Sequence, residues 1–348
     1  MRYFEVAELE VSRRREPSLS PLLPTEPSTA TGLDLSLVIP VFNERRNLRP
    51  LFESLRETLD ALGLRYEILF IDDGSTDGSA EELHSLEWSD PRVRVLELVR
   101  NFGQTAAIAA GFEHAQGRII IPMDADLQND PRDIPRILAK LQEGYDVVSC
   151  WRRERKDPWL TRILPSWVAN RLISRISGVY LHDYGCTLKG YRRELVQHIR
   201  LYGEMHRFIP IFASWAGAQV AEISVLHHPR QHGRSKYGIG RTLKVLLDLM
   251  TIKFLGSYST KPMYLFGGLG FLAFLGGSLL SAVTLWQKFF HGVKAHRNPL
   301  LLLSVFLFIV GLQFILFGLV AELIVRTYHE SQDKPIYRLK SRSANGSR

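Results

Sequence analysis

Two aspartates and a glutamine in the first half of the chain have types and spacing suited to binding a metal ion. Asp124, Asp126 and Gln128 directly follow the apolar run RIIIPM at 118–123. On an extended backbone, residues two apart point to the same side, so the three side chains would present their oxygen atoms together. Hard divalent cations such as Mg²⁺ and Mn²⁺ take one or two carboxylates together with phosphate oxygens. We therefore expect Asp124, Asp126 and Gln128 to form a metal site that also receives a phosphate.

Asp130, two residues further on, has a structural explanation instead. The segment Asp130-Pro131-Arg132-Asp133 has the residue types of a helix N-cap followed by proline at the first helical position. We therefore expect the Asp130 side chain to cap a helix rather than to bind a ligand.

Two further polar segments follow apolar runs, and each allows two interpretations. Asp72-Asp73-Gly74-Ser75 has residue types that favour a turn, with Thr76 or Asp77 capping the next helix. The Asp73 carboxylate could instead accept a hydrogen bond from a base or ribose. Pro40-Val41-Phe42-Asn43-Glu44 ends the first apolar run, and the proline is expected to end the strand ladder there. Glu44 either complements the dipole of a helix that begins near residue 47 or contacts a nucleotide.

Three basic clusters come after the acidic segments and before the apolar C-terminal third of the chain. Each could be a solvated loop, but guanidinium groups are also suited to bidentate binding of phosphate. Acidic metal ligands beside phosphate-binding cations fit a sugar-nucleotide donor and an anionic acceptor. The clusters are Arg152-Arg153-Glu154-Arg155-Lys156, Lys189-Gly190-Tyr191-Arg192-Arg193 and Arg230-Gln231-His232-Gly233-Arg234-Ser235-Lys236.

Alternating apolar periods predict the scaffold that must position these residues. Continuous apolar strands separated by helices are typical of an α/β fold with a mostly parallel sheet covered on both faces. Ligands of such sheets bind beyond the carboxyl ends of the strands, where the polar segments lie. The predicted strands are 35–41, 66–71, 93–98, 118–123 and 146–149, and the predicted helices are about 47–62, 78–86, 103–115 and 131–143.

The C-terminal third holds two long stretches without a charged residue, 263–286 and 300–321. As helices they reach about 36 and 33 Å, enough for a hydrocarbon core of roughly 30 Å, so two membrane spans are predicted. Basic residues are more frequent outside the pair than in the linker 287–299, which favours a cytoplasmic location for the large domain. The amphipathic segment 242–258 either lies in the membrane interface, which we favour, or packs on the globular domain.

Composition narrows the class of protein. The chain has 348 residues, with 44 Lys and Arg against 36 Asp and Glu, a net charge of +8. The two cysteines, Cys150 and Cys186, cannot form a disulfide framework, and no Cys/His spacing predicts a zinc site. Residues 1–33 are rich in proline and polar residues and are predicted to be disordered, without the apolar core of a secretory signal. A secreted disulfide scaffold and a purely soluble globule are therefore excluded.

The ordered motifs resemble those of the polyprenyl-phosphate glycosyltransferases of glycosyltransferase family 2, of which dolichol-phosphate mannose synthase is one. The resemblance covers about residues 35–330. It is carried by VIPVFNE, IDDGSTDGS, RNFGQ with AGF, MDADLQNDP, HDYGCTLKGYRR, RFIP and RQHGRSKY. HDYGCTLKGYRR and RFIP are most similar to the undecaprenyl-phosphate 4-deoxy-4-formamido-arabinose transferase branch. The resemblance implies a GT-A fold, an inverting mechanism, Mg²⁺ or Mn²⁺, a nucleotide-sugar donor with UDP favoured over GDP, and polyprenyl phosphate as acceptor.

The resemblance also implies roles for individual residues. Asp126 and Arg152 would be catalytic, and Asp183 would orient the acceptor side. The residues that would hold the nucleotide are Pro40, Phe42, Glu44, Ile71 and Asp73. Those that would hold the donor diphosphate and the metal ion are Asp124, Ala125, Asp126 and Gln128. Phosphate groups would be bound by Arg152, Arg192, Arg230 and Lys236, of which Arg152, Arg230 and Lys236 would contact the acceptor. Cys150-Trp151 and Thr187-Leu188-Lys189 depart from the pattern of the family, which leaves the choice of sugar open.

The expected organisation follows from these observations. It consists of a tail at 1–33, a GT-A domain at 34–240, an interfacial segment at 241–261, two transmembrane helices within 262–326 and a cytoplasmic tail at 327–348. The expected location is the inner (plasma) membrane with the catalytic domain in the cytoplasm. The expected partners are a nucleotide sugar, polyprenyl phosphate, the membrane and, as an open alternative, a second copy of the chain. No nucleic acid is expected.

Four other classes of protein fit the sequence less well. A processive polysaccharide synthase usually carries Gln-x-x-Arg-Trp and more spans, and neither occurs here. A nucleotidyltransferase would have a glycine-rich loop near the first strand, and a dinucleotide-dependent oxidoreductase would have Gly-x-Gly-x-x-Gly there. A catalytically inactive lipid-binding partner would not need both acidic strand ends and three basic clusters.

Overall fold

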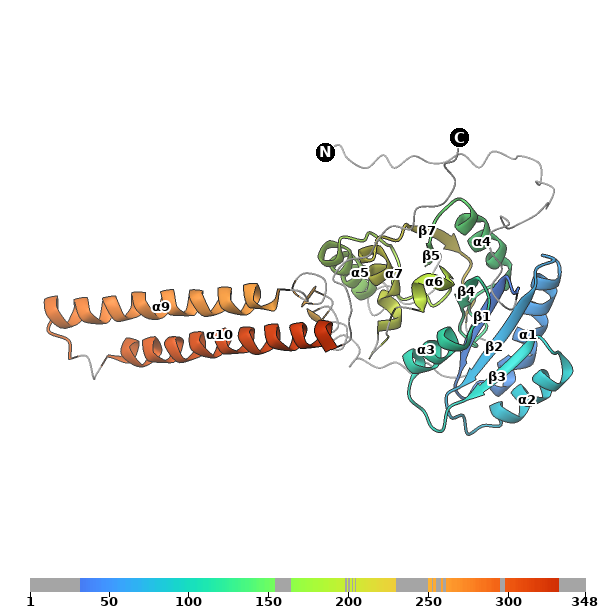
Figure 1. Cartoon of the computed structure of the whole chain (residues 1–348), viewed down its shortest axis with the longest axis horizontal. Coiled ribbons are helices and arrows are strands. Elements are labelled where there is room, and N and C mark those ends of the chain that lie inside the picture. Colours follow the sequence, from blue (N-terminus) through green and yellow to red (C-terminus); the bar gives the residue numbers. More distant parts are fainter. Residues whose placement is uncertain are drawn as a thin grey trace.

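The computed structural model describes residues 32–153, 164–197, 205–229, 261–294 and 298–331, with a few single positions between these ranges. Its globular part is built on a seven-stranded sheet in the order β3-β2-β1-β4-β6-β5-β7 (Figure 1). Strand β6 is antiparallel to both of its neighbours, whereas the other pairings are parallel. The strands are β1 (Leu35–Val41), β2 (Tyr66–Asp72), β3 (Val93–Glu97), β4 (Ile119–Pro122), β5 (Val147–Arg152), β6 (Lys189–Arg192) and β7 (Val220–Val225).

Helices cover both faces of this sheet. One core lies between the sheet and α1, α2 and α4, and a second lies between the sheet and α3, α6 and α7. This arrangement confirms the α/β class and the mostly parallel sheet predicted from the apolar periods. The helices of the globular part are α1 (Arg45–Asp60), α2 (Ser79–Ser89), α3 (Gln104–His114), the short η1 (Pro131–Asp133), α4 (Ile134–Gln142), α5 (Leu164–Ser177), α6 (Arg193–Val196), η3 (Met205–Phe208) and α7 (Ile209–Trp215).

Strands β1 and β2 are apolar at most positions because both of their faces are buried. Leu37 and Ile39 of β1 pack into the core on the α1 side, while Val38 packs into the core on the α3 side. Helix α1 packs against this surface with leucines at positions 48, 51, 55 and 59, a spacing that places them on one helical face. Burying a leucine side chain stabilises the fold by roughly 1.5–3 kcal/mol, so this shared face accounts for much of the docking of α1.

The expectation that Pro40 ends the strand ladder is wrong on the side of β2, where β1 continues through Val41 in register with that strand. On the side of β4 the ladder does end before the proline. The Val38 carbonyl accepts a hydrogen bond of 3.0 Å from the Met123 amide, on the side of β4. Pro40, two residues later, faces the same side, and β4 has already ended there at Pro122. The missing N–H of the proline therefore falls where no ladder bond is required.

Strand β6 was not predicted, and its direction has consequences for the basic segment that it contains. Lys189 at its start lies opposite Ser149 of β5, whereas Arg192 at its end lies opposite Ile119, the first residue of β4. The strand therefore runs from the carboxyl edge of the parallel strands to their amino edge. Lys189 and Arg192, which belong to the same basic cluster of the sequence, consequently lie at opposite edges of the sheet.

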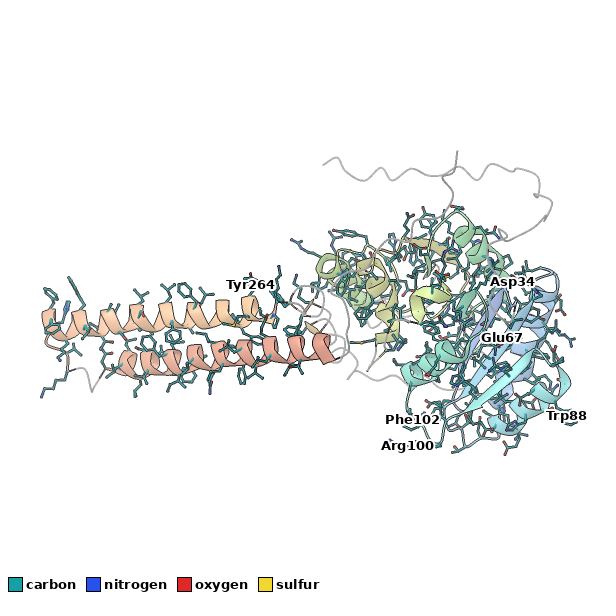
Figure 2. All side chains as sticks on the ribbon, in the orientation of Figure 1. Asp34, Glu67, Trp88, Arg100, Phe102 and Tyr264 are labelled. Atoms are coloured by element: carbon teal, nitrogen blue, oxygen red, sulfur yellow. The ribbon has the colours of Figure 1, made fainter. Side chains whose placement is uncertain are left out.

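Two long antiparallel helices, α9 (Pro262–Phe290) and α10 (Pro299–Ser331), extend from the globular part as a hairpin (Figure 1). Each is long and apolar enough to cross a membrane by length and composition, which agrees with the two predicted spans. Most of their apolar side chains point outward, among them Tyr264 (Figure 2). Such an extended apolar surface is unfavourable in water and indicates an apolar surrounding. The expected tails and most of the expected interfacial segment lie outside the described residues.

Small residues bring the two helices of the hairpin into close contact. A Cβ atom added to Gly270 would lie 2.8 Å from the Gly311 carbonyl oxygen, and one added to Gly311 would lie 3.0 Å from that of Gly270. The hydroxyl oxygens of Ser281 and Ser304 are 2.6 Å apart across the interface. Close backbone approach through small residues and interhelical hydroxyl pairs is a common way for helices to associate in lipid.

This packing predicts the effect of adding one methyl group. Gly270→Ala should lower the thermal stability of the purified protein in detergent, because overpacking of a tight contact costs about 1–3 kcal/mol. Gly268→Ala is the matched control, since nothing lies within 4 Å of a Cβ at that position. Equal melting temperatures for the two variants would show that the hairpin does not pack in this way.

Candidate active site

The polar segments singled out in the sequence gather at the carboxyl edge of the parallel strands. The sheet order places β1 between β2 and β4, so the chain winds outward in opposite directions from the junction of β1 and β4. At such a junction the loops after adjacent strands diverge and leave a crevice for ligands. The loops after β1, β2, β4 and β5 therefore form the candidate site.

The loops after β1 and β2 are tied together by reciprocal hydrogen bonds. The Asn43 amide donates to the Ser75 hydroxyl at 2.9 Å, and the Thr76 amide donates to the Asn43 side-chain oxygen at 2.7 Å. Asn43 has a φ of 56°, a left-handed conformation that asparagine tolerates better than most residues. Glu44 follows directly before α1, and its carboxylate accepts a hydrogen bond of 2.6 Å from Asn47. Asn47 thereby fixes a carboxylate at the rim of the crevice.

The Asp73 carboxylate holds the loop that leads into α3. It accepts hydrogen bonds from the backbone amides of Phe102 at 2.7 Å and Gly103 at 2.9 Å, and it is almost fully buried. Gly74 has a φ of 69°, and a Cβ there would lie 2.6 Å from the backbone of Arg100. Asp73 therefore has a structural role in this loop, and its contact with a nucleotide stays a prediction. Phe102 itself is half-exposed, with the Arg100 guanidinium 4.6 Å from its ring centre (Figure 2).

Asp124 and Asp126 interact, although the backbone reason expected from the sequence is wrong. Strand β4 ends at Pro122, and Leu127 has a φ of 60°, so the segment is a bent loop rather than an extended strand. Burial and then repulsion from Asp126 raise the pKa of Asp124 to about 6. The side-chain amide of Gln104, the first residue of α3, donates to the Asp124 carboxylate at 2.7 Å.

Gln128 and Asp130 attach this loop to the segment that follows β7. The side-chain nitrogen of Gln128 lies 3.4 Å from the His228 carbonyl oxygen, and the His228 amide donates to the Gln128 carbonyl at 2.9 Å. The Asp130 side chain accepts from the Arg132 amide at 3.0 Å, with Pro131 at the first helical position, which confirms the predicted cap. The Arg132 guanidinium holds the pKa of Asp130 well below its usual range.

The chemistry of this donor set fits a divalent cation that takes its remaining ligands from a phosphate. Two carboxylates repel each other at the carboxyl edge, and a cation between them would relieve that repulsion. The described residues hold no cluster of three or more His, Cys, Asp or Glu side chains that would form a complete cage. Mg²⁺ and Mn²⁺ need no such cage when substrate phosphates complete their coordination.

Arg152, the last residue of β5, is held in a fork by Asp183. Its Nε donates to one carboxylate oxygen at 2.7 Å and an Nη donates to the other at 3.0 Å. The side chain of Asp183 is 4% exposed and that of Arg152 is 17% exposed. The Arg152 charge also lowers the pKa of Asp124, so the two groups are close. Asp183 uses two of the five guanidinium donors, and N–H donors of this kind are suited to binding phosphate.

Lys189 is a site residue that the sequence analysis missed. Although it begins a basic cluster, it is only 2% exposed, and its Nζ donates to the carbonyl oxygens of Tyr184 and Cys186. Burial lowers the pKa of Lys189, while the Lys189 charge lowers that of Asp124. The reversed strand β6 explains this position, since it starts at the carboxyl edge. Lys189 is therefore a fixed counter-charge beneath the carboxylates.

Several expected site residues lie elsewhere. The expectation for Arg192 is wrong, because β6 carries it to the amino edge, where it binds the Leu141 carbonyl and pairs with Asp146. Ile71 is fully buried against α3, and Ala125 is buried in the other core, so neither side chain faces the crevice. Pro40 and Phe42 are partly exposed. Arg230 and Lys236 lie outside the described residues.

Comparison with known proteins agrees with this geometry. The profile described as glycosyl transferase family 2 matches residues 36–200. The dodecaprenyl-phosphate galacturonate synthase of Rhizobium johnstonii is 43% identical over 314 residues, which cover 88% of this chain and 92% of that relative.

Solved structures of a second protein share the fold. Glucosyl-3-phosphoglycerate synthase from Mycobacterium tuberculosis, in complex with Mn²⁺, UDP-glucose and phosphoglyceric acid, superimposes with a TM-score of 0.52. It is 18% identical, and the match covers 65% of this chain and 81% of that one. Its complex with Mg²⁺ and UDP gives a TM-score of 0.51 at 17% identity, over 64% and 80% of the two chains. This likeness confirms the expected GT-A-like fold.

The carboxylate pair predicts an unusual effect on stability. A carboxyl group with a higher pKa in the folded than in the unfolded protein makes folding less favourable as the pH rises through that interval. At pH 7.5 ionised Asp124 is therefore destabilising, and Asp124→Asn should raise the melting temperature without metal by about 2–4 °C, or roughly 1 kcal/mol. Added Mn²⁺ with UDP should stabilise the parent protein but not the variant. Equal stabilisation of both proteins by Mn²⁺ would contradict a metal site at Asp124.

Proposed function

The chain belongs to glycosyl transferase family 2 and is a glycosyltransferase, and we propose that it transfers a sugar from a nucleotide sugar to a polyprenyl phosphate with inversion at the anomeric carbon. The observation that supports this most is the placement of the Arg152–Asp183 fork beside the Asp124–Asp126 pair. A metal-phosphate site and a phosphate-binding guanidinium at one edge suit a diphosphate leaving group and a phosphate acceptor.

The donor half of the site is formed by the loops after β1, β2 and β4. Pro40, Phe42 and Glu44 line the nucleotide end, with Asp73 below them holding the loop before α3. Asp124, Asp126 and Gln128 hold the metal ion and the donor diphosphate. When bound, Mg²⁺ or Mn²⁺ stabilises the negative charge that develops on the leaving diphosphate. The neighbours crystallised with Mn²⁺ or Mg²⁺ and UDP support this choice of metal and of nucleotide.

The acceptor half is organised by Arg152. A phosphate monoester has a second pKa near 6, so at pH 7 the lipid phosphate is mostly dianionic and needs no strong general base. The protein must instead hold it in line with the anomeric carbon. Arg152 orients the acceptor phosphate, Arg230 and Lys236 contribute further cations to donor and acceptor, and Asp126 is the catalytic carboxylate on the metal side.

The sugar suggested by the Rhizobium johnstonii relative is a uronic acid. The Rhizobium johnstonii relative is a galacturonate synthase and shares most of its length with this chain. UDP-galacturonic acid is therefore the first donor to test, ahead of the UDP-4-deoxy-4-formamido-arabinose suggested by the motif HDYGCTLKGYRR. An inactive lipid-binding partner of another enzyme is the competing function, and it would bind lipid phosphate without forming any product.

The experiment that tests the function is an assay of membranes containing the full-length protein. Undecaprenyl phosphate is supplied with a panel of UDP- and GDP-sugars, and glycosylated lipid is identified by mass spectrometry. The proposal expects a product with one donor of the panel and its loss in EDTA. Tight binding of lipid phosphate without a product from any donor would favour the inactive partner.

Arg152→Ala separates the two halves of the site. Transfer to lipid phosphate should fall at least tenfold, because hydrogen bonds to a charged group are lost, while UDP binding should change less than twofold. Kinetic measurement of transfer and calorimetric titration with UDP check both expectations. Transfer at the parent rate, or a matching loss of UDP affinity, would show that Arg152 does not serve the acceptor.

The membrane topology proposed here places the globular domain and both termini in the cytoplasm of the cell that makes the nucleotide sugar. The two long apolar helices associate the protein with a membrane, and the basic flanks favour this orientation. A cysteine placed at Gly292, between α9 and α10, should react with an impermeant maleimide added outside intact cells or spheroplasts. A cysteine at Gly144, in the globular domain, should react only after lysis. The reverse labelling pattern would overturn the orientation.

A further inference from the structure

Glu222 lies on the edge strand β7 and turns its carboxylate toward the loop that carries Asp183. It pairs in parallel register with Ser149 of β5. Its side chain is 14% exposed, so it lies mostly below the protein surface. A carboxylate in such a position needs hydrogen-bond partners, because a partly buried charge without them is costly.

The partners of Glu222 are the two residues at the start of the Asp183 loop. One carboxylate oxygen accepts hydrogen bonds from the backbone amides of His182 at 2.8 Å and Asp183 at 3.3 Å. The other oxygen lies 2.6 Å from Nδ1 of the His182 ring. Glu222 thus binds the two residues at three atoms, namely two backbone amides and one ring nitrogen. These contacts hold the Asp183 backbone in place, and the position of the backbone determines the point from which the side chain extends.

Asp183 in turn fixes the position of the Arg152 guanidinium. Its carboxylate oxygens accept the two donors of the Arg152 fork, at 2.7 and 3.0 Å, and one of them also accepts the Gly185 amide at 2.9 Å. The fork geometry defines the plane of the guanidinium as well as its distance. A shift of the Asp183 backbone would therefore rotate the Arg152 donors that remain for a ligand.

Two further contacts hold His182 from neighbouring elements. The Trp151 ring stacks on the His182 ring with centroids 4.3 Å apart and an angle of 18° between planes. The Asn170 side chain of α5 donates to the His182 carbonyl at 2.7 Å. The turn at 182–183 is thus fastened to β5, α5 and β7 at once, and Glu222 supplies the bonds to its N–H groups.

We propose that Glu222 is a positioning residue for the acceptor phosphate, and that it acts by holding the backbone of Asp183, which in turn orients the Arg152 guanidinium. This role rests on the proposed function of Arg152 and extends it to a residue that does not itself touch a substrate. The functional consequence is specific: loss of Glu222 weakens the use of the phosphate acceptor and leaves the nucleotide end of the crevice intact.

The chain offers a matched control at the opposite edge of the sheet. Glu97 is the last residue of β3, and its carboxylate lies 2.5 Å from Nε2 of His84. It is therefore a second Glu–His pair on an edge strand, more exposed than the first and not joined to Arg152. Glu97→Ala removes a Glu–His pair of the same residue types at a position away from the Asp183 loop.

The test is steady-state kinetics of Glu222→Ala, Glu222→Gln and Glu97→Ala in the full-length enzyme, with KM measured separately for lipid phosphate and nucleotide sugar. Glu222→Ala should raise KM for lipid phosphate roughly tenfold, the order expected for lost bonds to a charged group, and change that for the donor less than twofold. Glu222→Gln keeps an oxygen that accepts the two backbone amides, so it should recover most of this loss. Glu97→Ala should behave as the parent.

A double variant distinguishes positioning from general damage. If Glu222 acts through Arg152, Glu222→Ala should add less than twofold to the defect of Arg152→Ala. Additive defects, an unchanged KM for lipid phosphate, or an equal rise in both KM values would overturn the proposal. Should Glu222→Ala fail to fold, Glu222→Leu, which removes the carboxylate but keeps most of the side-chain volume at this mostly buried position, is combined with Arg152→Ala in its place. Absence of product from the parent protein with every donor would instead refute the proposed function.

Discussion

Repulsion between Asp124 and Asp126 is the interaction on which the rest of the site depends. The two carboxylates lie at the end of a buried strand, where burial and then their mutual repulsion raise the pKa of Asp124 to about 6. The fold keeps them there by surrounding Asp124 with a hydrogen bond from Gln104 and with the charges of Arg152 and Lys189. These groups offset the cost of ionising Asp124 only in part, because its pKa stays raised. A cation bound between the two carboxylates, as we propose, would supply the rest and would also bind the diphosphate.

The topology of the sheet explains how these groups come together from distant parts of the chain. Parallel strands deliver the loops after β1, β2 and β4 to one edge, and the reversed β6 begins at that same edge with Lys189. The loop before β6 supplies Asp183, which holds Arg152 at the end of β5. In the function that we propose, the donor groups therefore come from the first half of the domain and the acceptor groups from the second. The helical hairpin associates this domain with a membrane, where a lipid-borne phosphate is available.

Much of this arrangement could be predicted from the sequence, for identifiable reasons. The parallel strands and their helices have long apolar periods, which predict their type and order. The Asp130-Pro131 pair is typical of a helix N-cap, and paired aspartates after a buried strand are typical of a metal site. Strand β6 has only four residues, KGYR, and no apolar run, so its direction and the burial of Lys189 could not be read from local pattern. Arg192 was misplaced for the same reason. The position of Glu222 depends on the register of β7 against β5, a long-range contact without a local signal.

The metal-phosphate site is tested most directly by the binding of Mn²⁺ to the metal-free protein, measured by electron paramagnetic resonance with and without UDP. Two carboxylates make an incomplete site, so we expect weak binding of Mn²⁺ alone and at least tenfold tighter binding when UDP supplies phosphate oxygens. Asp124→Asn and Asp126→Asn should each abolish that gain. Binding of Mn²⁺ that is equally tight without UDP, or that persists in both variants, would contradict a metal-phosphate site at this edge of the sheet.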